Sequence, residues 1–331
     1  MSGANEQGGA LTNSDAYPGH SATMTVSPRL DPRDSTTATV SIILLSALRW
    51  NLTERCLQSI YENTPGHALE IIVVDMGGSP DAENGLRGHA TRDDRIRLVM
   101  NQHNMGTSRG RNQALEVATG EFVVFLDNDA VVCPHWLDAL LRAAQVDNGI
   151  GLYGGKLICS NDHVYFCNRY IHDVVRDGRR YVGVNVTVPF FRDDPEVNSE
   201  ELVPWYPTGC LMGRRRDLLA IAGFDEGFRF VEEDKDLSLR MRELGKQILY
   251  VPGCEVIHDR GQDAVYDSTI RFKNTGEMQR DVRDFEKRWS CRVELIYSRE
   301  CLENLGYAPE LVEDMVGGPL KDLFTVIDEA P

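Results

Sequence analysis

Two carboxylates, Asp127 and Asp129, lie one residue apart directly after the apolar run 122–126. Five Phe, Val and Leu residues in a row are typical of a strand that is buried on both faces. Because side chains alternate along an extended chain, the two carboxylates can point the same way. Oxygen ligands at the carboxyl end of such a strand suit Mg²⁺ or Mn²⁺, with a phosphate to complete the shell. On spacing alone, a polar turn that ends a strand accounts for the pair equally well.

Other residues suited to nucleotide chemistry occur earlier in the chain. A second apolar run ends in Asp75, and Asn104–Gly106 opens a predicted helix whose first amides favour anions. Arg109 and Arg111 in this helix could neutralise a diphosphate, because the planar guanidinium matches phosphate oxygens. For either arginine alone, a solvated helix face is the simpler explanation. Together these residues are the parts of a nucleotide site.

The elements that must position these residues alternate between strand and helix. Strands are predicted at 38–45, 70–75, 96–100 and 122–126, and helices at about 51–61, 104–118 and 134–141. Short loops between alternating elements predict a mostly parallel, doubly wound, Rossmann-like α/β sheet. Beyond Gly149 the pattern changes. We expect a strand to 158, an irregular segment 160–206, two helices, a strand at 247–251 and a mainly helical region from 262.

The composition limits the class of protein. The chain has 331 residues, a formal net charge of -16 and eight scattered cysteines. The negative charge argues against nucleic acid or an anionic membrane as a general partner, although it leaves room for a local basic pocket for a phosphate. The scattered cysteines favour reduced thiols in a cytosol. No apolar run approaches the roughly 18 residues of a transmembrane segment, and no signal peptide is visible. Residues 1–38 show no apolar period and are predicted to form a disordered tail.

Seven stretches, taken in order and with their spacing, resemble the inverting family 2 glycosyltransferases of the GT-A fold. The resemblance covers about residues 39–260. It is carried by Val73–Asp75, Asn104–Gly106 with Arg111–Asn112, Asp127–Asp129, Gly223–Glu226, Glu233–Leu237 with Arg240, Tyr250–Pro252, and His258. None of these elements is specific alone, but their order and spacing are. The run from Gly223 to His258 is most similar to the bacterial rhamnosyl- and galactofuranosyltransferase branch.

The resemblance implies a domain organisation and an activity. We expect a GT-A catalytic domain at 39–261, with a nucleotide-sugar half at 39–148 and an acceptor half at 149–261. A C-terminal helical extension would follow at 262–331. The implied activity is a metal-dependent, inverting transfer of a sugar from a nucleotide-diphosphate sugar to an acceptor hydroxyl.

The resemblance also implies roles for the matching residues. Asp234 is the expected catalytic base, and Asp236 then supports Arg240 at i+4. The expected ligands of Mn²⁺ or Mg²⁺ are Asp127, Asp129 and His258. Donor binding is expected of Ser46, Asp75, Asn104, Gly106, Arg109, Arg111, Asp127, Asn128 and Gly209. Acceptor contacts are expected of Trp205, Tyr206 and Glu233, although buried packing is the preferred role for at least one of the two aromatic residues.

Two departures from the family and two alternatives bear on this interpretation. Ser46–Leu48 replaces a Thr-Tyr-Asn-like triplet, and Met76–Gly78 replaces Asn-Gly-Ser, so the contacts to the nucleoside are expected to differ. A sugar nucleotidyltransferase is disfavoured because Ser46–Asn51 lacks the glycine-rich loop of such enzymes. A non-catalytic scaffold with the same fold is disfavoured by the intact acidic residues.

The acceptor stays open at this point. It could be a saccharide, a lipid-linked saccharide or a small molecule, and the segment 160–206 is expected to contact it. We expect a cytoplasmic enzyme, which would work at the inner membrane surface if its acceptor is lipid-linked. The C-terminal helices are candidates for homo-oligomer contacts.

Overall fold

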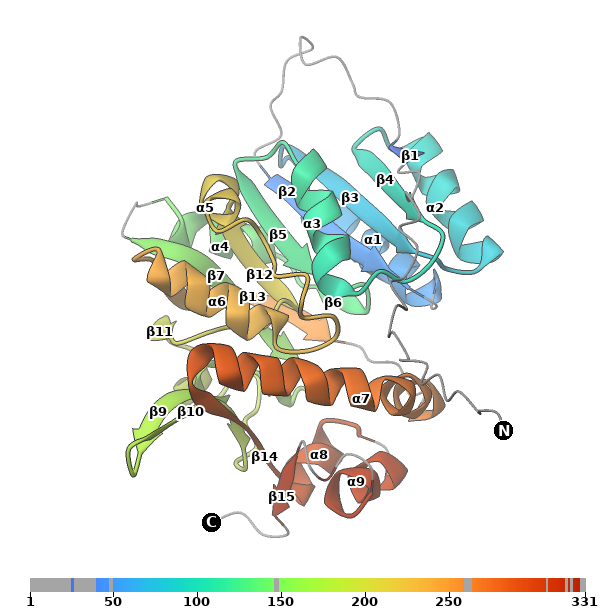
Figure 1. Ribbon diagram of the computed structural model, residues 1–331. Helices are drawn as coiled ribbons and strands as arrows, with labels where there is room; N and C mark the ends of the chain where they lie inside the picture. Colours follow the sequence, from blue (N-terminus) through green and yellow to red (C-terminus); the bar gives the residue numbers. More distant parts are fainter. Residues whose placement is uncertain are drawn as a thin grey trace, which may run out of the picture.

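The computed structural model describes residues 25–26, 40–47, 50–145, 149–258, 264–307, 309–318, 321 and 324–327. These residues form one large sheet with helices on both faces and a smaller sheet near the C-terminus (Figure 1). Thr25–Val26 forms β1, which pairs antiparallel with β4 (Ile96–Asn101) at the edge of the large sheet. The rest of the expected tail, and Leu48 of the departing triplet, lie outside the described residues.

The first half of the large sheet is the predicted doubly wound unit. Four parallel strands lie in the order β4, β3 (Leu69–Met76), β2 (Val40–Ser46) and β5 (Phe122–Leu126). α3 (Thr107–Val117) packs on one face, and α1 (Trp50–Asn63) and α4 (Trp136–Ala143) pack on the other. Because both faces are covered, the strands are apolar runs without alternation.

One helix of this half, α2 (Pro80–Arg92), has no counterpart in the sequence-based prediction. Ser79 caps it by accepting a hydrogen bond from the Ala82 amide, and Pro80 occupies the first turn. This pair is a recognised helix-start signal. Only Ala82 and Leu86 are buried, so no apolar stripe marks the helix in the sequence.

The second half of the large sheet is attached through one reversed strand. β12 (Cys210–Arg214) pairs antiparallel with both β5 and β7 (Ile150–Ile158), and β13 (Gln247–His258) runs parallel to β7. The long strands other than β12 therefore share one direction. Shorter antiparallel strands and two helices complete this half: β6 (Ala130–Val132), β8 (Val164–Phe166), β11 (Glu201–Val203), α5 (Arg215–Ala220) and α6 (Glu233–Glu243).

The second sheet joins the middle of the chain to its C-terminal part. Its order is β15 (Thr325–Ile327), β14 (Cys291–Ser298), β10 (Arg179–Val186) and β9 (Ile171–Arg176). The segment 160–206 thus contains a hairpin where an irregular stretch was predicted. The C-terminal helices are α7 (Ala264–Trp289), α8 (Arg299–Asn304) and α9 (Pro309–Val316), and 3-10 turns occur at Asn168–Tyr170 and Pro195–Val197. Of the helices in the described ranges, none is long and apolar enough to cross a membrane.

Candidate active site

Asp127, Asp129 and His258 lie together at one edge of the large sheet. The two aspartates follow β5, and His258 ends β13, where it pairs with Ala130 of β6. One ligand atom of each residue lies within 4.8 Å of those of the other two. Nε2 of His258 is 3.4 Å from Oδ2 of Asp127 and 3.6 Å from Oδ1 of Asp129. The fold therefore assembles the group that the sequence analysis proposed.

This group has the donor set of a divalent metal site. Burial alone would lower the pKa of His258, but the carboxylates of Asp129 and Asp127 outweigh burial and raise the pKa to about 9. The two carboxylates thus favour a positive charge at this point. Two carboxylate oxygens and one imidazole nitrogen fit a divalent cation, with diphosphate oxygens or water for its remaining positions. Binding would require the neutral imidazole and so would release a proton.

Gly209 and Tyr165 shape the surroundings of the group. A Cβ on Gly209 would lie 2.8 Å from Leu157 and 3.5 Å from Oδ2 of Asp127, so a side chain here would crowd the site. The Gly209 carbonyl accepts a hydrogen bond from the Asp127 amide at 3.2 Å. Tyr165 stacks on His258 with ring centroids 4.8 Å apart. Sequence reasoning missed Tyr165, because it belongs to the segment 160–206, in which no pattern was recognised.

The carboxyl ends of β2, β3 and β5 carry the polar residues expected near the nucleoside. Nδ2 of Asn128 donates to Oγ1 of Thr53 at 2.9 Å, and Oγ of Ser46 lies 3.2 Å from the same atom. Asp75 accepts the Gly78 amide at 3.1 Å, and burial raises the pKa of its carboxyl group. Thr53 was not predicted, because a threonine on a helix carries no functional signal in the sequence.

The start of α3 differs from the open anion site that was expected. The Thr107 amide donates to the Arg229 carbonyl at 3.0 Å, and the Gly106 amide donates to Oδ1 of Asn104 at 2.8 Å. Gly106 has φ 87°, and a Cβ on it would lie 2.6 Å from the Arg229 side chain. Asn104 and Gly106 therefore allow the loop that precedes α6 to pack closely here. The amides of Gly106 and Thr107 thus have acceptors within the protein, and donor binding by Asn104 and Gly106 stays a prediction.

The two arginines of α3 have different surroundings. Arg111 is buried, with Nη1 2.8 Å from Oε1 of Glu233 and Nη2 3.5 Å from Oδ1 of Asp127. Arg109 is half exposed and lies 4.0 Å from Glu226. Arg111 thus connects the metal group to the first residue of α6, whereas Arg109 takes no part in this cluster.

Three of the four acidic residues at the start of α6 are paired with a cation. The pairs are Glu232–Lys235 at 2.9 Å, Glu233–Arg111 at 2.8 Å and Asp236–Arg240 at 2.7 Å. Asp236 is fully buried and pairs with Arg240, four residues later on the same helix. This ion pair confirms the supporting contact that the sequence analysis expected.

Asp234 is the remaining acid, and its surroundings differ. It is only partly exposed, and it forms no ion pair with any side chain in the described part of the chain. One of its oxygens accepts a hydrogen bond from the Lys235 amide at 2.7 Å. Burial raises the pKa of Asp234, while the nearby Lys235 ammonium opposes the increase. A raised carboxyl pKa suits a group that must accept a proton.

Trp205 and Tyr206 do not present an open face to a ligand. Tyr206 is fully buried and donates its hydroxyl to the Gly155 carbonyl at 2.8 Å. Trp205 is also buried, with the Lys235 ammonium 4.8 Å from its ring centroid. The expectation that these rings stack on a sugar is therefore corrected: both pack inside the domain. Glu233, the third residue expected at the acceptor, is buried against Arg111.

The fold and the site define a class of protein. A mostly parallel α/β sheet in which an Asp-Asn-Asp strand end meets a histidine is the arrangement of a GT-A glycosyltransferase. A crystal structure of GalNAc-T7 with UDP, GalNAc and Mn²⁺ matches this fold with a TM-score of 0.54 and 16% identity. The match covers 66% of this chain and 43% of that chain.

The chain belongs to glycosyl transferase family 2, whose sequence model matches residues 41–220. It is therefore a glycosyltransferase that uses a nucleotide-sugar donor. A similar protein is the N-acetylglucosaminyl-diphospho-decaprenol L-rhamnosyltransferase of Mycobacterium tuberculosis, which is 26% identical over 67% of this chain and 78% of its own length. The GalNAc(5)-diNAcBac-PP-undecaprenol beta-1,3-glucosyltransferase of Campylobacter jejuni is 35% identical, over 32% of this chain and 34% of its own length.

Proposed function

We propose that this chain transfers a sugar from a nucleotide-diphosphate sugar to a hydroxyl group with inversion, using Mn²⁺ or Mg²⁺ held by Asp127, Asp129 and His258. The observation that carries the proposal is the convergence of these three side chains at the end of β5. When bound there, the cation would stabilise the negative charge that develops on the leaving diphosphate. Family membership favours this reaction over the nucleotidyltransferase and scaffold alternatives.

Asp234 is the proposed catalytic base. Its three acidic neighbours are each engaged by a cation, so a proton taken up by any of them would break an existing ion pair. Asp234 has no such pair among the described side chains and keeps one oxygen beyond its bond to the Lys235 amide. A single base that activates the acceptor hydroxyl gives one displacement at the anomeric carbon, and therefore inversion.

The proposed donor site surrounds these groups. Ser46, Asp75 and Asn128 lie at strand ends where a nucleoside can bind in an open α/β sheet. Arg111 places a buried positive charge beside Asp127, where the diphosphate of the donor would lie. Gly209 keeps the approach to Asp127 clear of a side chain.

The proposed acceptor is a saccharide carried on a polyprenyl diphosphate. The two relatives described above bear names that specify acceptors of this class. Such an acceptor would bring the enzyme to the cytoplasmic surface of the membrane. In this proposal, residues 39–148 bind the donor, residues 149–261 bind the acceptor, and residues 262–331 form an extension linked to the acceptor half through β10 and β14.

Binding of nucleoside diphosphates tests the metal assignment. UDP, GDP and dTDP are titrated by calorimetry into the wild type, Asp129→Ala and the control Asp138→Ala, each in Mn²⁺, Mg²⁺ and EDTA. Asp138 is an acidic residue of α4 outside the metal group, paired with His67 and His135. The matching nucleotide should bind the wild type and the control at least about tenfold more tightly in metal than in EDTA. This factor corresponds to about 1.4 kcal/mol of binding free energy contributed by the metal. Equal binding by the wild type in metal and in EDTA contradicts the assignment.

The stereochemistry provides a second test. With the identified donor and acceptor, proton NMR of the first product should show the anomeric configuration opposite to that of the donor. Retention of configuration would contradict a single displacement assisted by Asp234.

A further inference from the structure

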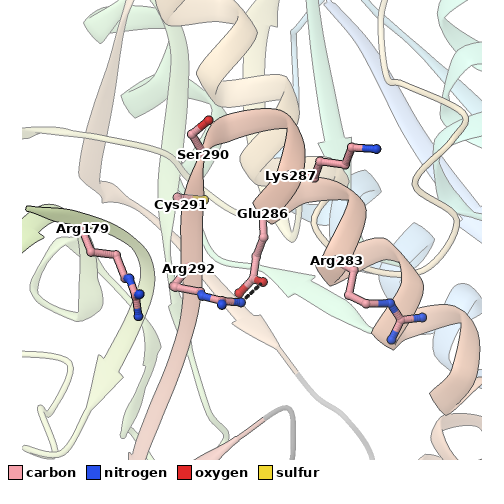
Figure 2. A pocket seen from close by; sticks show the side chains of 7 residues that line it. All are labelled: Arg179, Arg283, Glu286, Lys287, Ser290, Cys291 and Arg292. Carbon is pink, nitrogen blue, oxygen red and sulfur yellow. Dashed lines mark hydrogen bonds and ion pairs between the residues drawn. The ribbon is translucent and has the colours of Figure 1, made fainter.

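A pocket lined mainly by basic residues lies outside the candidate active site. It is about 390 Å³ in volume and lies between the C-terminal half of α7, the start of β14 and the start of β10. Its lining residues are Arg179, Arg283, Glu286, Lys287, Ser290, Cys291 and Arg292 (Figure 2). Four basic residues and one carboxylate thus line one open hollow, in a chain whose formal net charge is -16.

The one carboxylate of the pocket is already engaged. Oε2 of Glu286 accepts a hydrogen bond from Arg292 at 2.7 Å (Figure 2). Its Oε1 accepts the Val293 amide at 3.0 Å. No ion pair joins Arg179, Arg283 or Lys287 to a carboxylate within the ranges that the structure describes. The pocket therefore carries an excess of positive charge that the described protein groups do not balance.

Two neighbouring arginines of the hairpin differ from Arg179 in having acidic partners. On the same hairpin as Arg179, Arg176 pairs with Glu294, and Arg180 pairs with Asp173 at 2.7 Å. Arg176 and Arg180 thus have acidic partners, whereas Arg179 has no carboxylate partner among the residues that the structure describes.

The helix dipole explains only part of this arrangement. Lys287 lies in the last turn of α7, where a cation complements the exposed carbonyl groups. Arg283 lies a turn earlier, and Arg179 and Arg292 come from strands. Arg283 and Lys287 are also like charges at i and i+4, a spacing that is mildly destabilising in an isolated helix. A bound anion would relieve this repulsion.

The two faces of α7 have different roles. Asp281 and Phe285 are fully buried, and Oδ2 of Asp281 accepts the amides of Arg229 and Phe230 at 2.9 Å, in the loop before α6. Arg283 and Lys287 lie on another face of the helix, as expected for positions two residues away, and line the pocket. The pocket is therefore separate from the groups that hold the candidate active site.

We propose that this pocket binds a phosphate or diphosphate group at a second anionic site, distinct from the metal site. The planar guanidinium groups of Arg179, Arg283 and Arg292 match pairs of phosphate oxygens, and several cations around one hollow match an anion of multiple charge. Such a group can be carried by a lipid headgroup or by a free ion in solution. The proposal does not depend on the function proposed above.

The test uses the full chain and two charge-matched double variants. Arg179→Gln/Arg283→Gln removes two cations of the pocket, and Arg87→Gln/Arg92→Gln removes two cations from α2. One arm measures pyrophosphate binding by calorimetry in EDTA, so that a metal-bound complex does not form. The other arm measures flotation of the protein with phosphatidylcholine vesicles that contain or lack phosphatidic acid. Mn²⁺-dependent nucleotide binding is measured in parallel and should be the same in all three proteins.

We expect the wild type and the α2 variant to bind the phosphate-bearing probe. The pocket variant should bind it at least about tenfold more weakly, because each lost contact is a hydrogen bond to a charged group. Binding of phosphatidic acid vesicles without pyrophosphate binding assigns the site to a lipid-borne phosphate. Binding of pyrophosphate without vesicle binding assigns it to a free one. The proposal is overturned if the wild type binds neither probe, or if both double variants lose binding equally.

Discussion

Replacing Asp234 by Asn separates the roles of the acidic residues at the start of α6. The side chain is partly exposed, and its bond to the Lys235 amide can be kept by the amide oxygen of Asn. Stability should therefore change by less than about 1 kcal/mol, as for most substitutions away from a buried pair. The variant cannot take up a proton, so kcat should fall by roughly 10²- to 10⁴-fold, the usual contribution of a general base.

Asp236→Asn is the matched comparison and should behave in the opposite way. Asp236 is fully buried, with Arg240 at 2.7 Å and the Trp289 indole at 3.1 Å. Removing one partner of a buried ion pair costs about 3–5 kcal/mol, so this variant should lose much of its thermal stability. Its remaining folded fraction should keep a far larger share of the wild-type kcat than Asp234→Asn keeps.

The assay measures nucleotide release with the acceptor, or donor hydrolysis when no acceptor is known, beside melting curves and nucleotide affinity. Because burial raises the pKa of Asp234, the wild-type kcat/KM should fall on acidification at a pH above the ordinary Asp range. This acidic limb should be absent in Asp234→Asn. Near wild-type turnover in Asp234→Asn, with turnover abolished in Glu233→Gln, would refute the assignment of the base.

Three further changes have defined outcomes. Arg111→Gln leaves Glu233 buried without its cation, so urea unfolding should show a loss of about 3–5 kcal/mol and calorimetry a weaker affinity for nucleotide. Glu70→Gln removes a buried carboxylate. In the wild type, hydrogen bonds from Ser41, Thr119 and Arg97 outweigh burial and lower the pKa of Glu70 below its ordinary value of 4.5. The stability advantage of the wild type over the variant should therefore be full above pH 4.5 and shrink as the pH falls below it, as measured by urea titrations at several pH values. A chain that starts at Ala38 loses only the two-residue pairing of β1 within the described residues, so its melting temperature and turnover should change little; a large loss would show that the tail stabilises the domain.

The sequence was sufficient to predict the parts of the fold that repeat a simple pattern. The parallel strands β2, β3 and β5 are apolar at almost every position, and burial on both faces requires this. The metal group could be predicted from the end of β5 and from a histidine at the family's spacing, because strand ends in such sheets meet at one edge.

Other features depend on tertiary contacts that no local pattern reveals. Strand β9 of the hairpin is largely exposed and lacks the apolar alternation of a packed strand, whereas in β10 Val182, Val184 and Val186 alternate and are buried. The start of α3 has the glycine of an anion site, but the Arg229 carbonyl, which comes from far along the chain, occupies the Thr107 amide. Two adjacent aromatic residues, Trp205 and Tyr206, are compatible with sugar stacking in the sequence alone. The structure instead packs the Tyr206 ring against Gly154, where a Cβ would lie only 2.1 Å from the ring.

The reversed strand β12 has a consequence for the order in which the protein can fold. Cys210 pairs with Leu126 across 84 positions of sequence, so the open edge of β5 stays unpaired until β12 has been synthesised. β7 is synthesised earlier, but its neighbours in the folded sheet are β12, β13 and β8, so its native pairing does not cover this edge. An exposed central edge can pair with other chains, which makes this interval the one most prone to aggregation. The metal group needs His258 at the end of β13, so the active site can form only after the two halves of the sheet have joined.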